Sequence, residues 1–153
     1  LSNIIQFRKD EGTQLEKDLV DRIRSIEQLK AELQPHEENR MEKLREKLKH
    51  DVAVHVQEEL MDKNRFEEEL IFYLEKMDIN EEKVRLDTHC LYFMETLQED
   101  TMEKGKKLGF IAQEIGREIN TIGSKANDAN MQKIVVQMKD ELEKIKEQVL
   151  NIL

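Results

Sequence analysis

The sequence predicts an all-α fold, an elongated bundle of five or six helices, and three observations support this prediction. Charged residues make up 39% of the 153 residues and apolar residues 38%, a balance typical of long charged helices rather than of sandwiches or barrels. Apolar residues recur every three or four positions, which is the period of an amphipathic helix. The chain holds one proline and no tryptophan. We therefore expect one helical domain over residues 1–153.

The first helix is predicted over residues 3–33, because apolar residues recur there at helical spacing. These residues are Leu15, Leu19, Ile23, Ile26, Leu29 and Leu33. Pro35 lacks a backbone N–H and is predicted to end this helix. A second helix begins after it, marked by Met41, Leu44, Leu48 and Val52. Val52, Val54 and Val56 alternate as in a strand, but their Lys- and Glu-rich flanks lack turn residues, so we favour a helix.

Two further helices are predicted between residues 62 and 103. The one over 62–77 carries Phe66, Leu70 and Leu74 at helical spacing. A break at 78–82 precedes the next helix, which is expected to run to about Glu103. Asp78 or Asn80 can cap its start, and acidic residues in its first turn suit the helix dipole.

Two helices are predicted after the break at Glu103, one starting near Gly105 and the last over residues 128–152. Asn127 or Asp128 can cap the last helix. Its apolar residues alternate at spacings of four and three: Met131, Val135, Met138, Leu142, Ile145, Val149 and Ile152. Such a heptad stripe requires a partner helix. We predict a coiled-coil-like antiparallel pair of the first and last helices, with a self-paired coiled coil as the alternative.

Residues 104–128 contain four of the five glycines, and Gly109, Gly116 and Gly123 recur at a spacing of seven. Glycines on one helix face indicate that another element approaches the backbone closely there. A polar strip follows a different face of the same helix: Lys107, Phe110, Glu114, Arg117, Glu118, Thr121 and Lys125. The simplest interpretation of this strip is the solvated face of an amphipathic helix.

A second polar strip follows the helix predicted before it, where Asp78, Glu82, Arg85, His89 and Thr96 share one face. An acid, an arginine and a histidine in line can hold a divalent metal, or pair a general base with a phosphate-binding cation. The alternative is a surface row of ion pairs with a half-buried histidine. We expect the two polar strips to face each other, with Leu86, Phe93, Ile111, Ile115 and Ile119 buried beside them.

Charge and cysteine content exclude several classes of function. The net charge of −9 disfavours nonspecific binding to nucleic acids and anionic membranes, although residues 104–125 are locally basic. Cys90 is the only cysteine, which excludes an intrachain disulfide and a cysteine zinc cluster and fits a reducing cytoplasm.

No apolar run approaches the ~20 residues of a membrane span. The chain starts without methionine, directly in a helical pattern, so we expect it to be part of a longer protein.

Residues 105–126 resemble the carboxy-terminal signature of the bacterial YicC/YloC family, GRKLDFLxQEMNREANTIGSKA. Residues 64–69, 78–89 and 143–149 look like further blocks of that family, and Arg8, Glu11, Gly12 and Leu15 resemble an earlier R-x-x-E-G-x-x-L element. The resemblance covers essentially the whole chain, and its signature region is 62–127. An arginine, an aspartate and an asparagine of the signature are here Lys106, Gly109 and Gly116, so any role of those side chains in relatives is absent.

The resemblance implies a metal-dependent endoribonuclease that cuts single-stranded RNA, including small regulatory RNA, and assembles as a closed homo-oligomer in the cytoplasm. Family members carry an amino-terminal domain that is missing here, so this chain alone is expected to be weak or inactive. Combined with the polar strips, the resemblance implies four catalytic residues that also ligate Mn²⁺ or Mg²⁺: Glu82, His89, Glu114 and Glu118. It implies RNA-backbone contacts from Arg65, Arg85, Lys106, Lys107, Arg117 and Lys125.

Two non-enzymatic alternatives remain at the level of sequence. A coiled-coil oligomerisation module explains the heptads and the charge without any site. An RNA-binding regulator keeps the basic residues without chemistry. The aromatic content of 5% argues against RNA recognition by base stacking of the usual kind.

Overall fold

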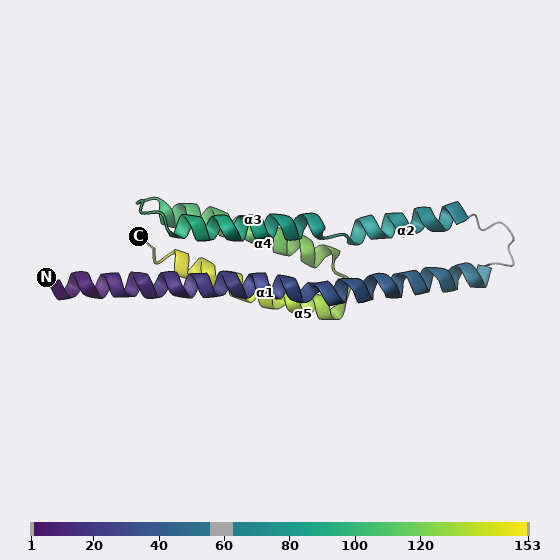
Figure 1. Cartoon of the computed structure of the whole chain (residues 1–153), viewed down its shortest axis with the longest axis horizontal. Coiled ribbons are helices and arrows are strands. Elements are labelled where there is room, and N and C mark those ends of the chain that lie inside the picture. The colour runs from purple at the N-terminus through teal and green to yellow at the C-terminus, as the bar shows by residue number, and fades with distance from the viewer. Residues whose placement is uncertain (1, 56–62, 153) are drawn as a thin grey trace.

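The structure is a computed structural model that describes residues 2–55 and 63–152, and these residues form five helices and no strand. The helices are α1 (Ser2–His55), α2 (Lys63–Met77), α3 (Asn80–Leu97), α4 (Lys104–Lys125) and α5 (Ala129–Val149). All five run roughly along one axis, so the molecule is an elongated bundle (Figure 1). The predicted all-α fold class is confirmed. None of the described helices combines the length and the hydropathy that crossing a membrane requires.

The predicted antiparallel pair of the first and last helices is present. α1 has 54 residues and therefore extends about 80 Å. α5 runs back along the first part of α1 (Figure 1). Ile23 of α1 and Met138 of α5 are both fully buried in the shared core, and Arg22 Nη1 lies 3.1 Å from Glu141 Oε2 at its edge.

α1 continues through Pro35, so the predicted helix end at residue 33 is wrong. Pro35 lies inside α1 on its exposed side. A proline in a helix interior costs about 3 kcal/mol, because it removes one hydrogen bond and crowds the preceding turn. Packing on both sides compensates for this cost, since Leu33 is fully buried before the proline and Arg40 is buried and hydrogen-bonded after it. The two helices predicted on either side of the proline are therefore one.

Other predicted boundaries differ from the structure by smaller amounts. α1 stays helical through His55, so Val52 and Val54 do not form a strand, whereas Val56 lies outside the described residues. α3 ends at Leu97 rather than near Glu103, because its core stripe stops there and the next apolar residue, Met102, is 99% exposed. Asp128 caps α5 as predicted, accepting hydrogen bonds from the backbone N–H groups of residues 130 and 131.

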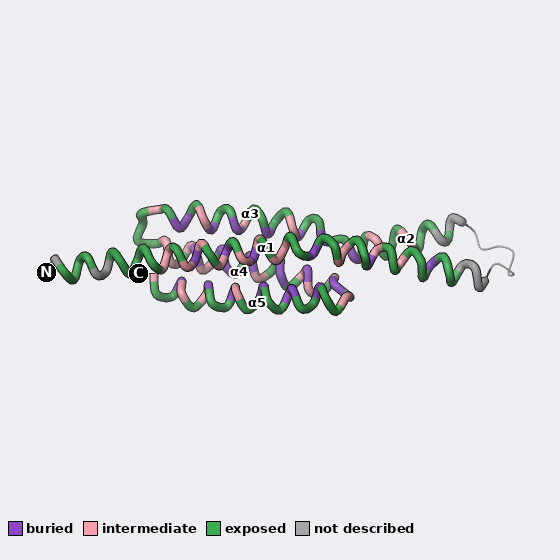
Figure 2. Tube along the Cα trace, turned by 60° about the horizontal axis from the view of Figure 1, so that its bottom comes forward, coloured by how far each residue is buried: buried purple, intermediate pink, exposed green. Residues whose placement is uncertain are grey.

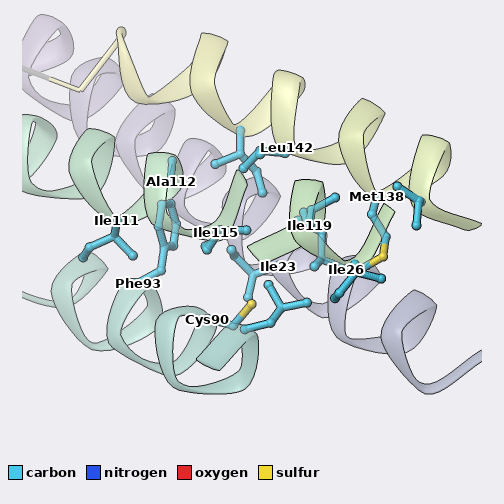
Figure 3. Packing of buried hydrophobic residues seen from close by; sticks show 14 of the residues in the cluster. Ile23, Ile26, Cys90, Phe93, Ile111, Ala112, Ile115, Ile119, Met138 and Leu142 are labelled. Atoms are coloured by element: carbon cyan, nitrogen blue, oxygen red, sulfur yellow. The ribbon is translucent and has the colours of Figure 1, made fainter. Parts of the chain in front are cut away.

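The hydrophobic core lies between α1, α3, α4 and α5. Buried positions on these four helices turn toward one another along the bundle (Figure 2). In the close view of Figure 3, Ile23 of α1, Phe93 of α3, Ile115 of α4 and Leu142 of α5 meet in this core. The five residues predicted to be buried beside the polar strips are each 5% exposed or less: Leu86, Phe93, Ile111, Ile115 and Ile119.

The glycine face of α4 packs on α5, as the seven-residue spacing predicts. A methyl group at Gly116 would lie 3.0 Å from Leu142 Cδ2, and one at Gly123 would lie 3.1 Å from Val135 Cγ1. At Gly109 the nearest atom would be 4.0 Å away, so this position has more room. Close approach is confirmed at Gly116 and Gly123. Because the glycine face of α4 packs on α5, the polar strip on another face of α4 is free to face α3.

α2 and the second part of α1 form a two-helix arm that extends beyond the four-helix part (Figure 1). In the described part of this arm beyond Arg40, Leu48 and Met77 are buried, whereas Ile71 and Phe72 are 54% and 60% exposed. The arm therefore buries far less apolar surface than the four-helix part. Both polar strips lie on the well-packed part of the molecule.

Candidate active site between α3 and α4

The polar strips of α3 and α4 face each other along the contact between these two antiparallel helices, as predicted. We call this line the α3–α4 seam, and three cross-helix contacts define it: Glu82 with Lys125, His89 with Glu118, and Glu99 beyond the end of α3 with Lys107. Along these three contacts the residue numbers rise on the α3 side and fall on the α4 side, as expected for an antiparallel pair of helices. The seam therefore has three parts, an end at Lys125, a middle at Glu118 and an end at Lys107.

The Lys125 end of the seam holds a closed ion pair. Glu82 is 4% exposed, and its Oε1 lies 2.8 Å from Lys125 Nζ. The same Nζ donates a hydrogen bond to the Asp78 carbonyl oxygen at 3.1 Å. Glu82 Oε2 is buried without a hydrogen-bond partner among the described groups. The negative charge of Glu82 is thus neutralised by a lysine, and Lys125 is held by two acceptors.

Arg40 of α1 binds the backbone at the Lys125 end of the seam. Its Nη1 donates to the Lys125 carbonyl oxygen at 3.0 Å, and its Nη2 donates to the Met77 carbonyl oxygen at 2.7 Å. Burial lowers the pKa of Arg40, while Glu37 and other nearby carboxylates oppose that change. The C-terminal ends of two helices, which carry partial negative charge, meet at this guanidinium. Our reading of the sequence missed Arg40, although its seven-residue spacing from Leu33 places it on the core stripe.

The middle of the seam holds a more loosely contacted carboxylate. Glu118 is 5% exposed, and its Oε1 lies 3.8 Å from His89 Nε2 and 3.9 Å from Arg85 Nη1. Both distances exceed those of direct hydrogen bonds. Arg85 also pairs with Glu81 one turn earlier, and the hydrogen bond that Arg85 donates to the Glu81 carboxylate raises the Arg85 pKa. A buried carboxylate is therefore grouped with a histidine and a guanidinium whose side chains are 25% and 48% exposed.

Glu114 and Arg117 lie beside this group on the same strip of α4, where Glu114 is one turn before Glu118 and Arg117 directly precedes it. Arg117 Nη1 is 3.6 Å from Glu114 Oε1, and the side chains are 75% and 44% exposed. Pairs of this exposure contribute little to stability. Both side chains therefore remain accessible, and Arg117, the more exposed of the two, can contact an external anion.

The four predicted metal ligands do not form one ligand cluster in this structure. Within residues 2–55 and 63–152, no three His, Cys, Asp or Glu side chains lie close enough together to hold a metal ion. Glu82 is paired with Lys125, Glu114 with Arg117, and Glu118 with His89 and Arg85. The residues present do not fit a metal held by all four predicted ligands.

The six predicted RNA-binding cations occupy different surroundings. Arg85 and Arg117 flank the middle of the seam, and Lys125 is committed to Glu82. Lys106 and Lys107 lie at the other end, where a hollow at the start of α4 is also lined by Phe110. Arg65 lies on α2 in the arm, 74% exposed and 3.7 Å from Glu69. The seam therefore groups five of the six cations, and Arg65 stands apart from them.

Comparisons with known proteins agree with the resemblance in the sequence. A family model described as "Endoribonuclease YicC-like, C-terminal" matches residues 33–153. The chain is 35% identical over 153 residues to a protein of Clostridioides difficile (strain 630) named "Probable endoribonuclease YicC", and the match covers 99% of this chain and 52% of that protein. A protein of the same name from Haemophilus influenzae is 34% identical over 92 residues, which are 60% of this chain and 32% of that protein. The chain spans about half the length of the first relative.

Proposed function

This chain belongs to the family of YicC-like endoribonuclease C-terminal domains, and from that premise we propose that the α3–α4 seam is part of an active site that cuts single-stranded RNA. The family membership supports an endoribonuclease role. The preference for single-stranded RNA, including small regulatory RNA, is the finer part of the proposal. It is supported by a seam that is open along one side of two helices and carries exposed cations.

One observation carries the proposal, namely the group formed by His89, Glu118 and Arg85. The buried carboxylate of Glu118 faces Nε2 of His89 at 3.8 Å, which leaves Nδ1 for proton transfer. A carboxylate behind a histidine orients the imidazole and stabilises its protonated form. Arg85 Nη1 lies 3.9 Å from the same Glu118 oxygen, so a cation that can face a phosphate stands beside the base.

In the proposed reaction, His89 accepts the proton of an RNA 2′-hydroxyl. The 2′-oxygen attacks the adjacent phosphorus, the bond to the 5′-oxygen breaks, and that oxygen takes up a proton from solvent water, while protonated His89 returns its proton to solvent. The products are a 2′,3′-cyclic phosphate and a 5′-hydroxyl end. Arg85 and Arg117 hold the phosphate charge, and Glu118 positions His89. A positioned general base typically contributes a factor of about 10²–10⁴ to the rate.

The dependence on Mn²⁺ or Mg²⁺ stays a prediction. The described residues offer no group of three or more protein ligands, so no step of the proposed reaction is assigned to a metal ion. This prediction is tested by comparing the rate of RNA cleavage in the presence of Mn²⁺ or Mg²⁺ with the rate in excess chelator.

The remaining parts of the proposal concern the protein beyond this chain. We propose that an additional amino-terminal part and a homo-oligomeric assembly complete the RNA path, in the cytoplasm. The relative from Clostridioides difficile is about twice as long as this chain, which supports the first point. Residues 1–153 carry a net charge of −9, so we expect them to bind and cut RNA weakly by themselves.

The test is cleavage of an end-labelled single-stranded RNA by the product of the whole gene. We expect cuts whose products carry a cyclic phosphate, and no cut where the 2′-hydroxyl is replaced by hydrogen. Products with 5′-phosphate ends would indicate that water, and not the 2′-hydroxyl, is the nucleophile that attacks the phosphorus. RNA that is bound but never cut would contradict the proposal and favour the non-enzymatic regulator.

A further inference from the structure

The start of α4 carries an exposed aromatic residue that the proposed reaction does not use. Phe110 is 58% exposed and lies on the polar strip of α4, between Lys107 and Glu114. Phe93, by contrast, is fully buried in the core, whereas Phe72 in the arm is also exposed. Few aromatic residues are present in the chain, but this one lies on the seam that the proposed function requires.

A second aromatic residue stands on the α3 side of the same end. Tyr92 is 42% exposed and follows His89 by one helical turn. Lys107 Nζ lies 5.1 Å from the centre of the Tyr92 ring, within the range of a cation–π contact. Lys107 Nζ is also 3.1 Å from Glu99 Oε1, and contacts with Tyr92 and Glu99 raise the Lys107 pKa. Lys107 thus covers the Tyr92 ring and joins α3 to α4 beside Phe110.

The hollow at the start of α4, which Lys107 and Phe110 line, is close to neutral. It is lined by Glu99, Glu103, Lys106, Lys107 and Phe110, together with Thr101 and Met102. The two acids balance the two lysines, and Glu99 is already paired with Lys107. Attraction of phosphate is therefore weak here, whereas the exposed face of Phe110 offers apolar, planar surface. Planar rings of this kind bind nucleobases by stacking, with little sequence preference.

We infer that Phe110 is a stacking platform for one nucleobase of single-stranded RNA, with Lys107, whose Nζ lies over the Tyr92 ring, lining the same hollow. This inference rests on the proposed function, because the stacked base belongs to the same strand that crosses His89. Phe110 and Arg117 are two helical turns apart on one strip of α4, about 10 Å along the axis. One strand can therefore contact Arg117 with a phosphate and Phe110 with a base.

The test uses single-stranded RNAs that carry the fluorescent base 2-aminopurine at successive positions, titrated with the whole gene product in chelator. We expect one position to be strongly quenched on binding. Phe110→Ala should abolish that quenching and weaken affinity about tenfold, with the salt dependence of binding unchanged. The matched control is Phe72→Ala, because Phe72 on α2 is 60% exposed but lies in the arm. Melting temperatures of both variants establish that they are folded.

The outcomes separate this inference from the proposed function. Quenching that depends on Phe110, in a protein that cuts no RNA, would uphold the stacking platform and overturn the proposed reaction. RNA that is cut normally, with Phe110→Ala and Phe72→Ala indistinguishable in affinity and quenching, would overturn the platform alone. An RNA without a base at the quenched position should bind wild type and Phe110→Ala equally, and a remaining tenfold difference would also overturn it.

Discussion

Glu82 and Glu118 are two buried carboxylates in the same seam, and their surroundings differ. Glu82 is 4% exposed and lies 2.8 Å from a lysine that has a second acceptor. Glu118 is 5% exposed, and its nearest basic groups, His89 Nε2 and Arg85 Nη1, are at 3.8 and 3.9 Å. The two carboxylates are therefore almost equally buried, but only Glu82 has a basic partner at hydrogen-bond distance.

This difference indicates which carboxylate supports the fold and which supports chemistry. A buried charge needs a partner, and removal of that partner is strongly destabilising. The short pair at Glu82 satisfies this requirement at the place where Arg40 joins three segments of the chain. The longer contacts at Glu118 are not direct hydrogen bonds, so this carboxylate is not closed by a cation as Glu82 is. Burial alone would not have separated the two roles.

The largest effect is expected when His89, the histidine beside Glu118, is removed. His89→Ala in the whole gene product should lower the cleavage rate by at least ~100-fold, the scale of losing a general base. The readout is single-turnover cleavage of labelled RNA, with melting temperature measured in parallel. His50→Ala, an exposed position of α1, is the control and should cleave normally. A folded His89→Ala protein with the wild-type rate would remove histidine from the mechanism.

At the Glu82 end, loss of the cation should change stability instead of chemistry. Lys125→Met leaves Glu82 buried without its partner and should lower the free energy of unfolding by about 2 kcal/mol, less than for a fully buried pair because Lys125 is 31% exposed. Urea denaturation measures this value. Adding Glu82→Gln to Lys125→Met should recover part of the loss. A double variant as unstable as the sum of its parts would mean that the two residues do not interact.

The matched pair Glu118→Gln and Glu82→Gln sharpens the comparison directly. Glu118→Gln keeps the shape but removes the charge that orients His89, and we expect kcat to fall about tenfold at unchanged KM. Glu82→Gln should leave kcat within about twofold and lower the melting temperature. Equal losses of kcat in the two variants would show that both carboxylates act through the fold.

The smallest effect concerns the cations at the edge of the seam. Arg117→Ala should weaken RNA binding by a few-fold and lower the salt slope by about 1, because one phosphate contact is lost. Arg65→Ala offers the contrast, since Arg65 pairs with Glu69 in the arm and stands apart from the seam. Binding titrations at several salt concentrations measure both. An Arg65→Ala effect as large as that of Arg117→Ala would extend the RNA path onto α2.

Much of the fold follows from apolar periodicity, because a helix must bury its apolar stripe. The stripes of α1 and α5 predicted their pairing, and the spacing of Gly109, Gly116 and Gly123 on α4 predicted a close approach, which is found at Gly116 and Gly123 but not at Gly109. The polar strips of α3 and α4 were predicted to face each other for the same reason, since the faces beside them are buried. The end of a helix at Pro35 was wrong, because the local cost of proline is overcome by tertiary packing on both sides.

The sequence by itself determined the fold class, the strips and the candidate residues His89 and Glu118. Only the tertiary structure decided that Glu82 is closed by Lys125, that Arg40 binds the ends of two helices, and that no three possible metal ligands lie together among the described residues. The physical reason is that periodicity fixes which face of a helix a residue occupies. The register and spacing between two helices depend on packing across the whole core, and these set every distance in the site.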